Sequence, residues 1–138
     1  MTDTHQISVS RLFDGVNWHH NVTVSWQQGR ITAIGPAGHH VTEATLVPGF
    51  IDIQVNGGGG VLFNTAPTIQ TLQSMVQAHA RYGTTALLPT VITDDIAVMQ
   101  QAAAAIADAI AHHEPGIIGV HFEGPHLSLP KRGIHPPR

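Results

Sequence analysis

The feature that most constrains this chain is a repeated alternation of strand and helix patterns after Pro48. Apolar runs at residues 50–55, 85–91 and 117–122 predict three strands, and the segments between them carry apolar residues at helical spacing. The strands recur about every 33 residues, a length typical of βαβ units with a right-handed crossover. Three parallel strands leave both edges of a sheet unpaired. We therefore expect a sheet that is continued by residues absent from this sequence or covered by another chain.

The two predicted helices have local boundary signals. Pro67 is suited to the start of the first helix and Gly83 to its end, and Thr93 is expected to cap the second helix. The apolar face of the first helix would consist of Ile69, Leu72, Met75, Val76 and Tyr82. The apolar stripe of the second would consist of Ile96, Met99, Ala103, Ile106 and Ile110.

The first part of the chain has a different pattern. Short β-rich runs are separated by turns, as where the alternating residues 21–26 are followed by Gln28 and Gly29. Alternation of this kind predicts an antiparallel sheet with one buried face. We therefore expect two domains, a partial small β domain over residues 1–47 and an α/β unit over residues 48–138.

The length and amino-acid composition of the chain exclude several classes of fold, binding site and partner. The 138 residues are too few for a complete α/β barrel of about 250, and the charged fraction of 11% is well below the usual ~25%, so we expect other protein to cover part of the surface. A net charge of −3 argues against nucleic-acid binding. The absence of cysteine excludes disulfides and thiolate metal sites. With no signal-peptide pattern and no apolar run of about 18 residues, the expected location is cytoplasmic, without membrane association.

Functional groups of parallel α/β folds collect at the carboxyl ends of the strands. Glu123 directly follows the third apolar run and precedes Gly124 and Pro125, so its carboxylate is the leading candidate for a metal ligand or a proton carrier. Pairing of that carboxylate with Lys131 or Arg132 is an equally good interpretation from spacing alone.

The first strand ends in polar residues and glycines. Gln54 and Asn56 alternate and can face one side, but amides are weak ligands for a zinc-like ion, which argues against a metal held there. The run of glycines at 57–60 lacks the residues of a phosphate-binding loop. A tight loop that needs positive φ is the favoured interpretation of that run.

Two histidines near Glu123 carry open alternatives. His121 shares a strand face with Glu123, so it either packs in the core or supports that carboxylate. His135 lies in a stiff loop before two prolines, where it either meets a ligand or is simply solvated. His126 is a weaker candidate of the same kind.

Several of these motifs together resemble one family. They are Val47-Pro48-Gly49-Phe50-Ile51-Asp52, Gln54-Val55-Asn56-Gly57, His121-Phe122-Glu123-Gly124-Pro125 and Lys131-Arg132-Gly133-Ile134-His135-Pro136. The first motif is typical of the amidohydrolase superfamily. The last two are similar to the N-acetylglucosamine-6-phosphate deacetylases, and the resemblance covers essentially the whole chain.

The resemblance implies a fold and an activity. The fold would be the N-terminal part of a TIM-like (β/α)8 metal-dependent hydrolase barrel, preceded by part of a small β-sandwich domain. The activity would be hydrolysis of the acetamide of N-acetylglucosamine 6-phosphate to glucosamine 6-phosphate and acetate. The whole enzyme would be a homodimer that acts on a small sugar phosphate.

The resemblance also implies roles for residues. Glu123 would be one ligand of a single divalent ion (Zn or Fe/Mn/Co-type), and Ile134 (through its backbone) and His135 would contact substrate. His121, Gln54 and Asn56 would support the site, and Gln54 and Asn56 match the single-metal branch of the family. The two histidine ligands and the catalytic Asp of the family would follow Arg138, and an aromatic residue is expected where this chain has His126.

Without those groups, the 138 residues alone are expected neither to hold the metal tightly nor to turn over substrate. Two other functions stay open from the sequence. One is another amide or cyclic-amide hydrolase of the superfamily, made less favourable by the absence of histidine at positions 54 and 56. The other is a non-catalytic fragment or association module, which the low charge content and open sheet edges favour for the chain as given.

Overall fold

The computed structural model describes residues 3–137, and the chain divides into two compact units after Pro48. The first unit contains β1 (His5–Phe13), β2 (Trp18–Gln27), β3 (Arg30–Pro36) and β4 (Thr42–Leu46). The second contains β5 (Phe50–Val55), β6 (Gly57–Gly58), β7 (Val61–Leu62), α1 (Ile69–Ala80), β8 (Thr84–Ile92), α2 (Ile96–Ala111), β9 (His121–Glu123) and the short 3-10 helix η1 (Leu129–Lys131).

The first unit is one four-stranded sheet in the order β3-β2-β1-β4. β1 and β3 both pair antiparallel with β2, and Val9, Leu12, Val22 and Val24 form one buried cluster. The expectation of a wholly antiparallel sheet is wrong at β4, which pairs parallel with β1. The reason is topological: the chain crosses from β3 at one edge to the opposite edge beside β1.

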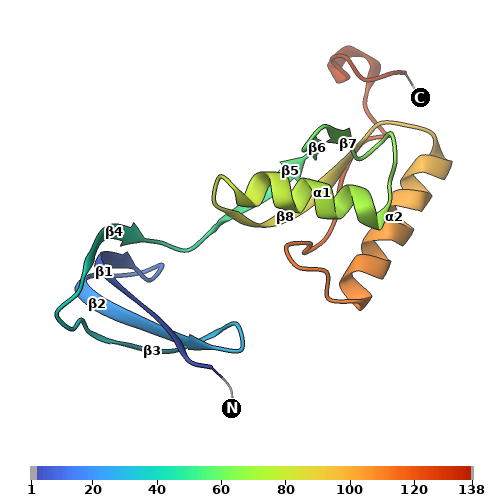
Figure 1. The fold of residues 1–138 in the computed structure, drawn as a ribbon. Helices are drawn as coiled ribbons and strands as arrows, with labels where there is room; N and C mark the ends of the chain where they lie inside the picture. Colours follow the sequence, from blue (N-terminus) through green and yellow to red (C-terminus); the bar gives the residue numbers. More distant parts are fainter. Residues whose placement is uncertain (1–2, 138) are drawn as a thin grey trace. The chain divides into compact units, whose positions relative to one another are not determined.

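The second unit is built on a parallel sheet in the order β5-β8-β9, with β8 in the centre (Figure 1). The predicted strand–helix alternation is confirmed, since α1 connects β5 to β8 and α2 connects β8 to β9. The register aligns Thr90 with His121 and Ile92 with Glu123. The ends of β8 and β9 therefore lie next to each other.

The helices cover one face of this sheet. Val55, Leu87 and Val91 of the strands share a buried cluster with side chains of α1 and α2 such as Leu72 and Ile106. The edge strand β5 nevertheless exposes large apolar side chains at Phe50, Ile51 and Ile53. Part of the sheet's apolar surface is thus left without cover by the described residues.

Several predicted helix details need correction. α1 begins at Ile69 with Thr68 as its cap and ends before Arg81, so Tyr82 lies outside the helix and is 83% exposed. In α2 the buried residues are Ala102, Ile106 and Ala109, while Ile96 and Ile110 are exposed. The face that packs is therefore rotated toward the small alanines, which let α2 approach its neighbours closely.

The N-terminus of α2 also differs from the expectation. Asp95 occupies the cap position, and Thr93 does not cap the helix. The Thr93 hydroxyl instead donates to the backbone carbonyl of Glu123, an interaction that the local sequence does not reveal.

The third strand is shorter than predicted. Only His121–Glu123 forms continuous pairing with β8, and Ile117 makes an isolated bridge to Leu87. The glycines at 57–60 form the first arm and turn of a small hairpin, β6–β7, with positive φ at Gly59 and Gly60. Positive φ was the expected use of these glycines, although the loop leads into a hairpin before the helix.

Within residues 3–137, neither helix combines the length and the apolar character that crossing a membrane requires.

Candidate functional site

Glu123 ends β9, where the carboxyl ends of the parallel strands meet. It is in register with Ile92 of β8, and it lines a pocket of ≈ 520 Å³. The pocket is lined by Gln54, Asn56, Leu62, Ile92, Glu123, Ile134, His135 and Pro136. His121 and Glu123 share a strand face, whereas Phe122 between them points to a hollow beside α2. The carboxylate therefore lies on the face of the sheet opposite the helices.

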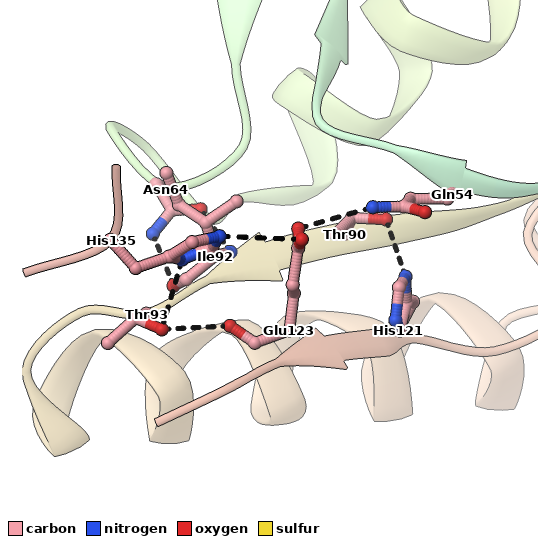
Figure 2. Close-up of polar contacts among 8 residues, drawn as sticks. All are labelled: Gln54, Asn64, Thr90, Ile92, Thr93, His121, Glu123 and His135. Atoms are coloured by element: carbon pink, nitrogen blue, oxygen red, sulfur yellow. Dashed lines mark hydrogen bonds and ion pairs between the residues drawn. The ribbon is translucent and has the colours of Figure 1, made fainter. Parts of the chain in front are cut away.

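Two side chains approach the Glu123 carboxylate from opposite sides (Figure 2). The Gln54 amide donates to Oε2 over 3.2 Å, and Nε2 of His135 lies 3.4 Å from Oε1. Neither Lys131 nor Arg132, the alternative partners considered from the sequence, forms an ion pair with this carboxylate. The Arg132 guanidinium donates to the backbone carbonyl of His135. Glu123 thus faces the pocket, and within residues 3–137 its carboxylate is not paired with a Lys or Arg side chain.

His135 is held at three points. Its backbone N–H donates to the Arg132 carbonyl over 3.1 Å, its own carbonyl accepts from the Arg132 guanidinium, and ring atom Nδ1 lies 3.1 Å from the Thr93 hydroxyl. Its side chain is 16% exposed. Ile134, next to it, is fully exposed, which leaves its side chain without packing in the described residues. The loop after η1 therefore presents a fixed imidazole at the rim of the pocket.

Asn64 supports the end of β8, a role that the sequence did not reveal. The Asn64 side chain accepts from the Ile92 N–H and donates to the Ile92 carbonyl, over 3.0 and 3.1 Å, and so replaces a strand partner at the end of β8. Asn64 also donates to Asp94. A lone asparagine in a loop gives no sequence signal for this role.

His121 belongs to a different set of contacts. Its Nδ1 lies 3.3 Å from the hydroxyl of Thr90, which accepts from the Val55 N–H over 2.9 Å. His121 is not among the residues that line the Glu123 pocket. Gln54, Asn56, Glu123, Ile134 and His135 are therefore brought together at one pocket, and His121 contacts the interior of the sheet through Thr90.

The donor set of the pocket suits part of a divalent metal site. A carboxylate oxygen is a good ligand for Zn²⁺ and for harder dications, and a strand end is a common place for it. Among residues 3–137, however, no group of three His, Asp or Glu side chains is placed to hold an ion. Glu123 fits the role of one ligand, and further ligands would have to come from outside this part of the chain.

The chain is similar in sequence to proteins of known activity. No family model matches the chain. It is 67% identical over 99 residues to the N-acetylgalactosamine-6-phosphate deacetylase of Shewanella sp. strain ANA-3, a match that covers 72% of this chain and 25% of that protein. It is 39% identical over 92 residues to the N-acetylglucosamine-6-phosphate deacetylase of Haemophilus influenzae, covering 67% of this chain and 24% of that protein.

A solved structure extends the similarity to the fold. The crystal structure of N-acetylglucosamine-6-phosphate deacetylase from Pasteurella multocida superimposes with a TM-score of 0.86 at 29% identity, over 97% of this chain and 38% of that one. The chain therefore spans about a quarter of the length of its curated relatives and matches their N-terminal part. The predicted fold class, the N-terminal part of such a hydrolase, is confirmed.

Proposed function

Because this chain belongs, as the counterpart of their N-terminal part, to the family of N-acetylglucosamine- and N-acetylgalactosamine-6-phosphate deacetylases, we propose that the whole protein is a sugar-phosphate deacetylase. The reaction is hydrolysis of the acetamide, so that water adds to the acetyl carbonyl, the C–N bond breaks, and acetate and a 2-amino sugar 6-phosphate leave. The observation that carries this proposal is the Glu123 carboxylate, which faces a strand-end pocket beside His135.

Glu123 would supply one ligand to a single divalent ion, and the remaining ligands and the catalytic Asp would come from outside the described residues. Such an ion supplies Lewis acidity and lowers the pKa of bound water. In this chain, the Gln54 amide orients the carboxylate by donating to Oε2. The pairing of a carboxylate with an amide, in place of a second acid or a histidine at position 54, supports a site for one ion and not two.

The substrate would lie against the loop after η1. The exposed Ile134 offers its backbone, and the anchored His135 ring offers a hydrogen-bonding atom at the pocket rim. Both belong to a loop that is stabilised by the hydrogen bond from the Arg132 guanidinium to the backbone carbonyl of His135. These two residues are therefore proposed as substrate contacts, with Gln54, Asn56 and His121 in support.

Two substrates that differ only in configuration at C4 are candidates, N-acetylglucosamine 6-phosphate and N-acetylgalactosamine 6-phosphate. The resemblance of the motifs points to the glucosamine substrate. The relative at 67% identity is, however, named for the galactosamine epimer, and the relative at 39% for the glucosamine one. The higher identity to the galactosamine enzyme is the reason to test N-acetylgalactosamine 6-phosphate as a second candidate substrate.

The architecture of the whole protein is part of the proposal. Residues 1–47 would form part of a small β domain, and residues 48–138 the first β/α units of a catalytic (β/α)8 barrel. The exposed Phe50, Ile51 and Ile53 on edge strand β5 support this, because further strands and helices of a closed barrel would cover them. A cytoplasmic homodimer is the proposed state.

The test is a deacetylation assay on the whole protein that carries this segment. The protein is loaded with Zn²⁺, Fe²⁺, Mn²⁺ or Co²⁺ in turn and given each of the two N-acetylated sugar phosphates, and acetate release is measured. We expect release from at least one epimer and its loss on chelation. Release of acetate from neither epimer under any of the four metals would refute the proposal.

A further inference from the structure

We propose that Thr93 is a positioning residue of this site, whose hydroxyl fixes the orientation of the His135 ring and the ring atom that carries its proton. The inference rests on the proposed function, because it gives Thr93 a part in that reaction. It concerns a residue whose local sequence suggests only a helix cap.

The geometry places one hydroxyl between two parts of the pocket. Thr93 is 3% exposed, and its Oγ1 lies 3.0 Å from the backbone carbonyl oxygen of Glu123 and 3.1 Å from Nδ1 of His135 (Figure 2). The same side chain therefore contacts the end of β9 and the loop after η1. These are the two segments that line the pocket with a carboxylate and an imidazole.

The donors and acceptors of this contact are determined by chemistry. A hydroxyl has a single hydrogen, and a carbonyl oxygen can only accept, so the Thr93 hydrogen is given to Glu123. The remaining contact of Oγ1 must then be one in which it accepts, and Nδ1 of His135 is the donor. Nδ1 is protonated in this arrangement whether the ring is neutral or cationic. Nε2 is left as the atom that faces Glu123 and the pocket.

The surrounding backbone holds Thr93 in this place. Asn64 binds both backbone polar groups of Ile92, the residue before Thr93. Gly124 has a φ of +105°, in the left-handed half of conformational space, and a Cβ built on it would lie 2.1 Å from the Thr93 hydroxyl oxygen. Only glycine at position 124 leaves room for the hydroxyl, so the residue after Glu123 and the position of Thr93 depend on each other.

The experiment uses the whole protein and three variants. Thr93→Val keeps the shape and removes the hydroxyl, Thr93→Ser keeps the hydroxyl, and Thr85→Val is a matched control at an exposed threonine on β8. Histidine ring 15N signals, assigned to His135 with a His135→Gln variant, report the protonated atom. Steady-state kinetics separate kcat from KM, and thermal unfolding checks the fold.

We expect Nδ1 of His135 to be protonated in the wild type, and this state to be lost in Thr93→Val and restored in Thr93→Ser. We expect kcat/KM to fall about 10–100-fold in Thr93→Val, as for other groups that orient a catalytic side chain, and to recover to within a few-fold in Thr93→Ser. Thr85→Val should match the wild type in both measurements.

A neutral His135 that carries its proton on Nε2 in the wild type would overturn the proposal, and this result needs no variant to fold. Unchanged ring signals and kinetics in a folded Thr93→Val would also overturn it. If the whole protein releases acetate from neither sugar phosphate, the proposed function fails, while the 15N signals still decide the relation between Thr93 and His135.

Discussion

The Nε2 atom of His135 lies 3.4 Å from the Oε1 atom of Glu123, and the two residues reach this separation from different segments. Glu123 comes from the end of β9, and His135 from the loop after η1, which Arg132 and Thr93 anchor. A carboxylate and an imidazole so placed at one pocket can together hold and polarise a small polar ligand.

Replacing Glu123 by Gln should remove the metal and the activity of the whole protein. Gln preserves the shape and can still accept from Gln54, but an amide is a poor ligand for a dication. Loss of a direct ligand should lower kcat/KM by more than the ~100-fold upper range seen for groups that only orient ligands. Metal content is measured by elemental analysis. His126→Ala, at an exposed residue outside the Glu123 pocket, is the control and should keep both metal and rate.

A second metal should be gained when Gln54 and Asn56 are both replaced by His. Both residues line the Glu123 pocket, so two histidines at these positions would present their imidazoles to the same pocket. We expect the metal content of the whole protein to rise from one to two ions per chain. The Gln54→Ala, Asn56→Ala double variant should stay at one. Equal metal content in the two double variants would contradict this prediction.

Thr90→Val should destabilise the protein although it preserves the side-chain shape. Thr90 is fully buried, and its hydroxyl accepts from the Val55 N–H over 2.9 Å. Valine leaves that buried N–H without a partner, which costs about 1–3 kcal/mol in free energy of unfolding. Urea unfolding of the whole protein measures the change. The exposed Thr85→Val on the same strand should change stability by about 0.5 kcal/mol or less, and equal effects at the two positions would count against this account.

The contribution of the Asp14 carboxylate to the stability of the first unit should depend on pH. The Asn17 N–H, the His19 side chain and the Val16 N–H hydrogen-bond its carboxylate and hold its pKa at about 2, below the usual 3.8. Because the folded-state pKa is lowered, its contribution to stability is fully present above pH 3.8 and is lost as the pH falls through about 2. Carboxyl 13C signals give the titration directly. A midpoint near 3.8 for Asp14 would show that these hydrogen bonds do not persist in solution.

The sequence indicated the candidate residues and helix faces that depend on local pattern. Glu123 and His135 could be named as candidates because a carboxylate after an apolar run, and a histidine just before Pro136, are visible in a few residues of sequence. Pattern alone left other interpretations of both residues open, and the structure places both at one pocket. The core of α1 followed from helical spacing, and Leu72 and Met75 are buried as that spacing predicts.

The parts that the sequence did not predict depend on distant contacts. Thr93 followed by two aspartates is a typical helix cap, yet its hydroxyl binds the carbonyl of Glu123, thirty positions along the chain. Tertiary hydrogen bonding outweighs the local preference there. Asn64 shows the same limit, because its pairing with Ile92 exists only once β8 is placed beside it. The exposed Ile96 and Ile110 show that periodicity identifies a helix more readily than its packed face.

The most direct test of the central claim is an anomalous diffraction measurement on crystals of the whole protein loaded with Zn²⁺. We predict an anomalous peak about 2.0–2.2 Å from a carboxylate oxygen of Glu123, with Gln54 and His135 beside it. A metal peak remote from Glu123, with that carboxylate bound by an arginine or lysine of the whole protein, would contradict the account.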